Sequence, residues 1–318
     1  MYEPKIIWIE DTPFGYQIGR TTFIPPHMHE NLLEIIYCMN GTIKFDYAYD
    51  ELTLNEGEFI AVDRDMHRLH SGENAVLAFI YIDISYFSDI HPGISDLSFI
   101  CEYCTGSLHP KRKAHEMLKA TLIALLYFIA TSDSRDPGYK ETIIRSTNEI
   151  INLFMDKFDI IAYFQPDGYI SPEIHSHIRN ILKYIHTHYS EKLTLSDLSR
   201  QVHLTVPYVS EMLSKYVICF EDIVGYIRAC HSEKLLFLTD MTVAEISEEC
   251  GFSATRYYYK AFKQWYKCTP KQFRDFFLKK GNEEKEAFES LSSYDMVPFL
   301  QKIILEHYME LFLEKAPS

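Results

Sequence analysis

The sequence is poor in glycine and proline, and its cysteines form an odd set. Twelve glycines and 13 prolines among 318 residues exclude a collagen-like or largely disordered chain. No apolar run reaches the roughly 18 residues that a membrane-spanning helix needs, and the N-terminus lacks the apolar core of a signal peptide. Seven scattered cysteines fit reduced thiols better than a disulfide framework. These absences favour a cytoplasmic globular protein with no membrane partner.

Acidic residues outnumber basic residues, 45 to 31, and the net charge of −14 at first argues against nucleic acid as a partner. The imbalance is not uniform along the chain. Residues 178–279 hold 14 basic and 11 acidic residues, a balance of +3, whereas the other 17 basic and 34 acidic residues give −17. Because binding to phosphate needs local positive charge, this segment is able to bind DNA although the whole chain is acidic.

Apolar periodicity and turn residues divide the chain into five segments. Within the first ninety residues, short β segments such as 32–39, 57–63 and 75–84 favour a small sandwich or barrel. Helices are expected at 115–131 and 140–164, and their long apolar stripes, which a small barrel could not cover, predict a homodimer. The expected division is a β domain (1–100), a helical dimerisation region (101–164), a linker (165–177), an all-helical domain (178–279) and a helical tail (280–318).

The all-helical domain contains an internal repeat with a period of 48 residues. Thr194 and Thr242 each stand three residues before an acid, Asp197 or Glu245. This is the capping-box pattern, in which the two side chains satisfy free N–H groups at the start of a helix. The pattern predicts that the same short helix begins twice.

Each of these helices is followed by a tight turn and a second helix, for which Thr205 and Ser253 are the expected N-caps. Helix, short turn and capped helix form a helix-turn-helix, whose second helix fits a DNA major groove about 12 Å wide. A further helix is expected over 220–238. It could hold the two recognition helices about one turn of DNA, roughly 34 Å, apart.

Residues 245–274 resemble the signature of the AraC/XylS family of transcription regulators. The matching positions are Ile246, Gly251, Phe252, Tyr257, Phe262, Lys263, Thr269, Pro270 and Arg274. Val217 and Lys267 depart from it, because the family often has a turn glycine at those places. The resemblance implies an α+β multidomain protein with an N-terminal cupin-like β-barrel, dimer helices and a C-terminal all-α tandem helix-turn-helix domain. It also implies double-stranded DNA and RNA polymerase as partners, with activation as the expected effect.

The resemblance further implies which side chains face DNA. In the first recognition helix they are Pro207, Ser210, Glu211, Ser214 and Lys215, and in the second Thr255, Arg256, Tyr259, Lys260 and Lys263. Arg256 can form two hydrogen bonds with guanine O6 and N7, and the lysines can neutralise phosphates. Glu211 could accept a hydrogen bond from cytosine N4 or simply be a solvated helix residue.

The segment HMHENLLEIIYCMNG, which starts at His27, resembles the cupin-type sensor of the same family. The resemblance implies a pocket for a small-molecule effector, such as a carbohydrate, lined by His27, His29, Glu34, Tyr37 and His67. The three histidines and the glutamate are also candidate ligands of a first-row metal, or could be purely structural. Asp63 and Asp65 replace the usual proline and glycine of the second cupin motif. No cofactor is expected.

Three functions are compatible with these patterns. The expected one is a regulator that binds DNA under the control of an effector and has no catalytic residues. The second is a metal-dependent cupin enzyme whose helical domain serves only for localisation. The third is the regulatory part of a larger chain.

Overall fold

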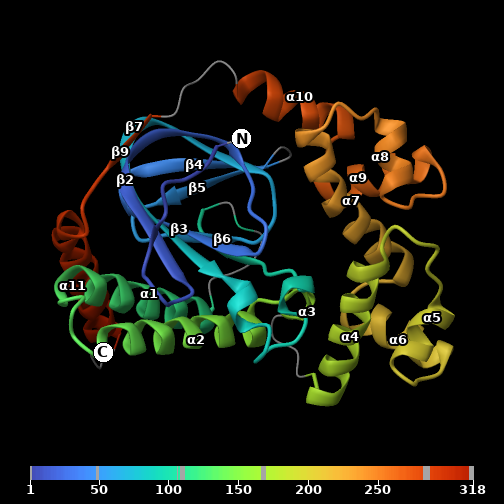
Figure 1. Cartoon of the computed structure of the whole chain (residues 1–318), viewed down its shortest axis with the longest axis horizontal. Coiled ribbons are helices and arrows are strands. Elements are labelled where there is room, and N and C mark those ends of the chain that lie inside the picture. Colours follow the sequence, from blue (N-terminus) through green and yellow to red (C-terminus); the bar gives the residue numbers. More distant parts are fainter. Residues whose placement is uncertain are drawn as a thin grey trace.

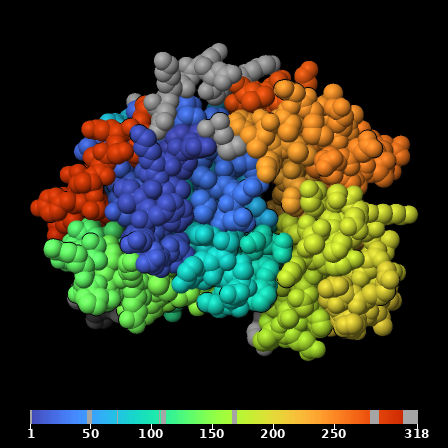
Figure 2. All heavy atoms as spheres, in the orientation of Figure 1, coloured from blue at the N-terminus to red at the C-terminus, as the bar shows by residue number. Residues whose placement is uncertain are grey.

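The computed structural model describes residues 2–47, 50–105, 107, 112–165, 170–281 and 287–314, of which 47, 50, 72, 279–281 and 306–314 are described by their backbone. A curled antiparallel sheet and three helices form one half of the molecule, and seven helices stack beside it as the other half (Figure 1). One further short helix, 160–164, packs on the core of this second half at the junction. The second half consists of two helical units, one above the other, along one side of the molecule (Figure 2).

The sheet forms a curled, partly open barrel. Its strands are β1 (Ile7–Trp8), β2 (Phe14–His27), β3 (Leu32–Asn40), β4 (Thr42–Tyr47), β5 (Asp50–Asn55), β6 (Phe59–Val62), β7 (His67–Asp83), β8 (Cys101–Tyr103) and β9 (Ala287–Ser290). The order is β1-β2-β7-β3-β6-β8, with β4 paired to β5 and β7, and β9 paired to β2. Register shifts between β2 and β7, at Thr21/Phe23 and Ile24/His27, bend these two long strands. The β segments expected from the sequence are confirmed.

The helices follow the β domain in chain order. They are α1 (Lys113–Thr131), α2 (Tyr139–Lys157), α3 (Ile160–Phe164), α4 (Pro172–His188), α5 (Leu195–Gln201), α6 (Val206–Tyr216), α7 (Phe220–Leu238), α8 (Val243–Glu249), α9 (Thr255–Tyr266), α10 (Pro270–Gly281) and α11 (Val297–Glu314). The helix predicted over 220–238 is confirmed as α7. Helix α4 begins six residues before 178, so residues 172–177, expected in the linker, form its first turns.

The apolar stripes of α1 and α2 are covered within the chain. Leu122 and Leu126 of α1 and Ile150 and Phe154 of α2 are buried in one core with one face of the sheet and with α11. The premise that the barrel alone had to cover these stripes was therefore wrong, and the homodimer stays a prediction without this argument. Helix α1 is the one described helix long and apolar enough to cross a membrane, and its buried apolar face makes it a core helix.

The tail after α10 returns to the β domain, which the sequence did not predict. Strand β9 pairs with β2 between Gly19 and Phe23, and Met296 and Leu300 are buried in the same core as α1. The tail needs Gly19, because a Cβ atom there would lie 2.3 Å from the Phe288 ring. The helical domain is thus joined to the β domain at both of its ends (Figure 1).

Candidate functional site

The first helix-turn-helix unit consists of α5 and α6. The predicted capping box is present: Thr194 N donates to the Asp197 carboxylate at 2.9 Å, and Asp197 N donates to the Thr194 hydroxyl at 3.3 Å. Val209 and Leu213 of α6 are buried, which orients the opposite side of the helix outwards. Of the residues expected to face DNA, Ser210 is half-buried and the others are exposed: Pro207, Glu211, Ser214 and Lys215.

The second unit, α8 and α9, repeats this arrangement. Tyr258, Phe262 and Tyr266 anchor α9 in its own core. The outward face has exposed residues Arg256, Tyr259, Lys260 and Lys263, with Thr255 half-buried. This surface has three cations and no acid among the residues expected to face DNA, which suits it to phosphate and guanine.

The sequence did not single out Tyr257 as a residue of this face. Tyr257 is 47% exposed, its hydroxyl accepts a hydrogen bond from Arg256 Nη2 at 3.0 Å, and the Arg256 guanidinium lies 4.8 Å from the ring centroid. The ring therefore holds the guanidinium at the surface of α9.

The turns of the two helix-turn-helix units share a left-handed residue but differ in how the next helix is capped. His203 and Gly251, at equivalent repeat positions, both have left-handed backbones, with φ of 56° and 76°. Thr205 is the N-cap of α6, although its hydroxyl makes no cap hydrogen bond. The prediction of Ser253 as the N-cap of α9 was wrong: the helix begins one residue later, at an Ala254 cap that has no polar side chain.

In the β domain, three imidazoles converge on one buried carboxylate. The Nε2 atoms of His27, His29 and His67 lie 3.5, 3.4 and 3.2 Å from Glu34 Oε2. The side chains of His27, Glu34 and His67 have no exposed surface, and that of His29 is 11% exposed. The structure thus brings together four of the five residues expected at the effector site.

Tyr37 is not part of this cluster. Side chains alternate between the two faces of a strand, so Tyr37 lies on the face of β3 opposite to that of Glu34. There it is fully buried and stacks on Phe59 in the core that includes α1 and α2. Its expected role in effector binding is not supported by this position.

The hydrogen bonds around the cluster determine what it can bind. His27 Nδ1 lies 2.8 Å from the Pro25 carbonyl and His67 Nδ1 lies 3.0 Å from the Asp65 carbonyl. Carbonyls accept, so Nδ1 of each ring donates and has a proton, and a ring without a second proton has a free lone pair on Nε2. That lone pair then faces a carboxylate oxygen, an arrangement that is repulsive unless a cation lies between them.

The geometry of the cluster fits a divalent metal ion. Ligand atoms about 2.1 Å from one ion lie roughly 3.0 to 3.4 Å apart in octahedral or tetrahedral sites, close to the observed separations. Burial opposes the charged form of Glu34, but the histidines around it hold its pKa well below the usual range. Burial lowers the pKa of His67 to about 4, so this ring is neutral, as a metal ligand must be. The ligand atoms of His27, Glu34 and His67 all lie within 4.8 Å of one another, so these residues could hold a first-row ion, with His29 beside the same carboxylate oxygen.

The loop that leads into His67 docks on the second helix-turn-helix unit. Met66 is 1% exposed and lies in the core of that unit with Tyr258 and Phe262. Its backbone N donates to Glu233 Oε2 of α7 at 2.9 Å, and Tyr266 donates to the other oxygen of this carboxyl. Met28, between His27 and His29, packs against the same core. Both histidine loops thus reach the DNA-binding half directly.

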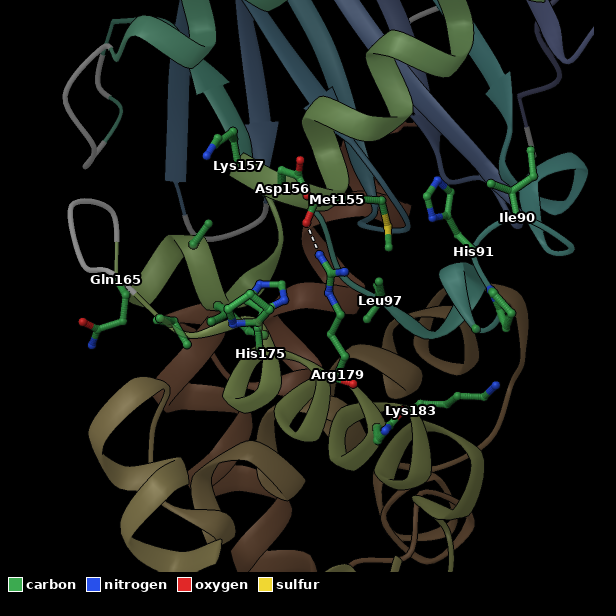
Figure 3. Close-up of a pocket in the computed structure, with 18 of the residues that line it drawn as sticks. Ile90, His91, Leu97, Met155, Asp156, Lys157, Gln165, His175, Arg179 and Lys183 are labelled. Carbon is green, nitrogen blue, oxygen red and sulfur yellow. Dashed lines mark hydrogen bonds between the residues drawn. The ribbon is translucent and has the colours of Figure 1, made fainter. Parts of the chain in front are cut away.

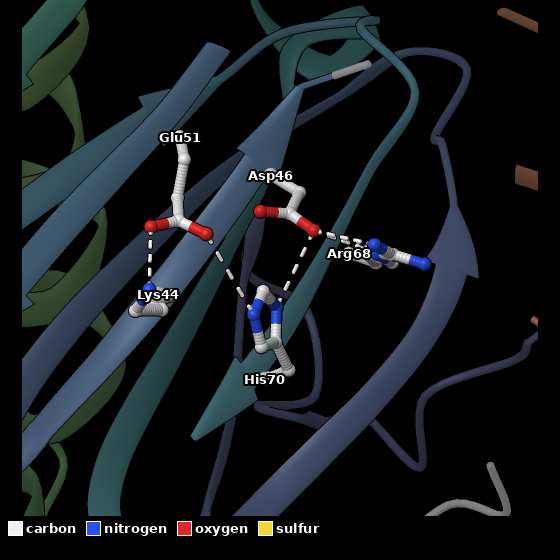
Figure 4. A network of polar contacts seen from close by, with 5 residues as sticks. All are labelled: Lys44, Asp46, Glu51, Arg68 and His70. Atoms are coloured by element: carbon white, nitrogen blue, oxygen red, sulfur yellow. Dashed lines mark hydrogen bonds and ion pairs between the residues drawn. The ribbon is translucent and has the colours of Figure 1, made fainter. Parts of the chain in front are cut away.

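A polar network extends this contact to α10. Arg68 donates to the Asp46 carboxylate from Nε at 2.8 Å and Nη2 at 2.7 Å, and His70 Nδ1 lies 3.3 Å from the same oxygen (Figure 4). The Arg68 guanidinium lies over the Phe276 ring at 4.3 Å. An ion pair between Lys234 and Glu30 joins α7 to the β2–β3 loop.

A second junction lies where α4 meets the helices of the β domain. Asp159, 1% exposed, caps α3 and lies 3.1 Å from His175 Nε2 and 3.2 Å from Arg179 Nη2. Arg179 also donates to the Met155 carbonyl, across an open cavity of about 720 Å³ (Figure 3). The remaining labelled cations of this cavity point apart, so they define no single anion site.

These features define the class of the protein. Two capped helix-turn-helix units, joined by α7 and with both recognition faces exposed, form a DNA-binding domain of the tandem type.

The comparisons with known proteins agree. A family described as "Helix-turn-helix domain" matches residues 198–275. Regulatory protein PocR of Salmonella typhimurium is 36% identical over 100 residues, which cover 31% of this chain and 33% of PocR. Transcriptional activator PerA of Escherichia coli is 28% identical over 124 residues, 39% of this chain and 43% of PerA. The chain thus spans between about a third and two fifths of these relatives.

Among solved structures, ToxT from Vibrio cholerae aligns with 83% of this chain and 98% of its own, at 12% identity and a TM-score of 0.41. The C-terminal domain of AraT from Geobacillus stearothermophilus aligns with 34% of this chain and 87% of its own, at 28% identity and a TM-score of 0.29. Residues 198–275 thus form an AraC-type helix-turn-helix DNA-binding domain similar to those of the regulators PocR and PerA. PocR and PerA are named as regulators of this kind, and neither is named as an enzyme.

Proposed function

We propose that this chain binds specific double-stranded DNA through α6 and α9 and regulates transcription in the cytoplasm. Its β domain would control this regulation. The observation that supports this most is the pair of exposed recognition helices at the two ends of α7, the second of them basic. Helix α7 is buried between the two units and fixes their separation, as a protein that reads two successive major grooves requires. DNA would repel the acidic remainder of the chain, so that contact with DNA would be restricted to the surface of α6 and α9.

Selection from a random DNA pool tests this proposal. The purified chain is expected to enrich one sequence with two half-sites about one helical turn apart, and to bind it at least a thousandfold more tightly than random DNA at physiological salt. Equal affinity for enriched and random DNA would show that the protein is not a sequence-specific regulator.

The direction of regulation follows from the relative PerA, which is named a transcriptional activator. We propose activation, with RNA polymerase as the partner at the promoter. A reporter gene behind the selected sequence should rise in expression when the chain is supplied. A fall would identify a repressor.

We further propose that the cluster of His27, His29, Glu34 and His67 holds a first-row divalent ion and supports the docking loops. What supports this is the meeting of three Nε2 atoms with one buried carboxylate, none of them with a well-formed hydrogen bond, which a cation between them would resolve. The ion would orient His67 and His27 and thereby the adjoining Met66 and Met28. Elemental analysis of untagged protein should find one Fe, Mn, Ni, Co or Zn per chain, and a value near zero after growth with all five would refute it.

A further inference from the structure

The two helix-turn-helix units have separate hydrophobic cores, and α7 passes from one to the other (Figure 1). Among the described residues, the buried part of the first core ends on α7 at Ile227, and that of the second begins there at Ala229. Helix α7 has 19 residues, a length of about 28 Å, so it sets the distance between the units. Without a continuous core, two units joined by one helix can still bend and twist relative to each other.

A contact beside α7 restricts this freedom. Arg228 lies between the two cores, and its Nε and Nη2 donate to the carbonyls of Tyr189 and Glu191, each at 2.7 Å. Both carbonyls belong to the loop between α4 and α5, in the first unit. The same guanidinium lies 5.7 Å from the ring centroid of Phe252, in the turn of the second unit. His231 of α7 also stacks flat on the Tyr189 ring, with 3.7 Å between the centroids.

The same loop lies against the turn of the second unit. A Cβ atom on Gly251 would lie 2.5 Å from the carbonyl oxygen of Ser190 and 2.7 Å from its Cα. The left-handed backbone alone does not require glycine here, because His203 has the same conformation at the equivalent position of the first unit. What requires glycine is the close approach of the two backbones. Residues 189–191 are thus held between α7 and the α8–α9 turn.

The orientation of one unit relative to the other determines which DNA spacing the protein can read, a consequence that rests on the proposed function. Helices α6 and α9 are each anchored in the core of their own unit. One base pair added between two half-sites moves the second by about 3.4 Å along the DNA axis and turns it by roughly 35°. Units locked to each other can follow neither change, whereas units hinged at α7 can follow both in part.

We propose that Arg228 and Gly251 are positioning residues that fix the number of base pairs between the two half-sites. Neither needs to contact a base, because the Arg228 guanidinium is engaged by two carbonyls and Gly251 has no side chain. Both act on the loop 189–191, which belongs to neither recognition helix. Their loss should therefore relax the choice of spacing and leave the base preference of each unit intact.

Binding to a series of DNA duplexes tests the proposal. Each duplex has the two half-sites that the wild type selects, at the selected spacing or with one or two base pairs added or removed. The spacing ratio is the affinity for the selected spacing divided by the mean affinity for the others. It should be roughly tenfold or more in the wild type. In Arg228→Met, which keeps the side-chain length but neither hydrogen bond, it should fall to about threefold or less.

A duplex with the α9 half-site alone shows whether each variant still folds and reads DNA, and its affinity should not change in Arg228→Met. Arg228→Lys keeps the charge and should restore the spacing ratio in part. Arg200→Met removes the same charge from α5, outside this contact, and should keep the wild-type ratio. Gly251→Ala should lower the ratio as Arg228→Met does, whereas His203→Ala, the matched change in the first turn, should not.

A spacing ratio that falls in Arg228→Met and Gly251→Ala but not in their two controls supports the proposal, provided that binding to the single half-site is kept. A ratio that stays at the wild-type value in Arg228→Met overturns it, and so does an equal fall in Arg200→Met, because the lost charge would then be the cause. Wild-type protein that prefers its selected half-sites but ignores their spacing overturns this inference alone. Wild-type protein that does not distinguish selected from random DNA overturns the proposed function.

Discussion

Replacing Met66 by alanine should loosen the β domain from the second helix-turn-helix unit without unfolding either. Met66 is 1% exposed, and every other buried residue of its hydrophobic cluster belongs to the DNA-binding half. Truncating a buried methionine to alanine costs about 2 to 5 kcal/mol. We take the lower end, because an interface between two domains relaxes more easily than a single core and the hydrogen bond from Met66 N to Glu233 is retained. About 2 kcal/mol lowers the ratio of docked to undocked protein roughly 30-fold.

Hydrogen exchange of the backbone amides measures this ratio locally. Amides of α7 near Glu233 and of residues 63–67 should exchange up to about 30-fold faster in Met66→Ala, while amides in the centre of β7 keep their rates. Met117→Ala is the matched control: it removes the same side chain at a position 50% exposed on α1, and should change nothing. Unchanged exchange in α7 of Met66→Ala would refute the claim that this loop holds the two halves together.

Four other substitutions have defined outcomes. Lys263→Ala should weaken binding to all DNA sequences alike and reduce the slope of log affinity against log salt by about one unit, as measured by titrations at several salt concentrations. His203→Gly should raise the free energy of unfolding by about 0.5 to 1 kcal/mol in urea denaturation, since it relieves a left-handed histidine. Gly251→Ala should lower it by more than 1 kcal/mol, since the new Cβ would lie 2.5 Å from the Ser190 carbonyl oxygen; equal stability of these two variants would contradict the turn geometry. His67→Ala should reduce bound metal to near zero in elemental analysis, and full retention would remove His67 from the ligand set.

Local patterns predicted the helical half well, because helix starts are determined by side chains a few residues apart. The capping boxes at Thr194 and Thr242 form as the sequence predicts, and α7 has the predicted bounds. The N-cap of α9 is Ala254 and not the predicted Ser253. Alanine makes no side-chain cap hydrogen bond, so its residue type could not indicate a helix start.

Long-range contacts were what the sequence could not reveal. Strand β9 is short and mostly exposed, and its pairing with Gly19 spans more than 260 residues of chain, so it leaves no periodic signal. The apolar stripes of α1 and α2 were visible, but their partner, α11, was not. Within the candidate site, the histidines and the glutamate of the motif lie together as predicted. Tyr37 does not join them, because it is three residues from Glu34 on the same strand and its side chain therefore points to the opposite face. This could have been predicted from the sequence. The docking of Met66 on Glu233 had no local signal.

The base preference of the Arg256→Ala variant tests the central claim most directly. If α9 reads bases, selection with this variant should return the wild-type DNA sequence with the preference lost at one base pair, a guanine in the wild type, and binding to the original sequence should weaken by about 1 to 3 kcal/mol. Lysine at position 256 would keep the charge but not the two-pronged hydrogen bonds, and should restore the affinity only in part. An unchanged selected sequence and unchanged affinity in Arg256→Ala would contradict the account, because the exposed face of α9 would then not be the surface that recognises DNA.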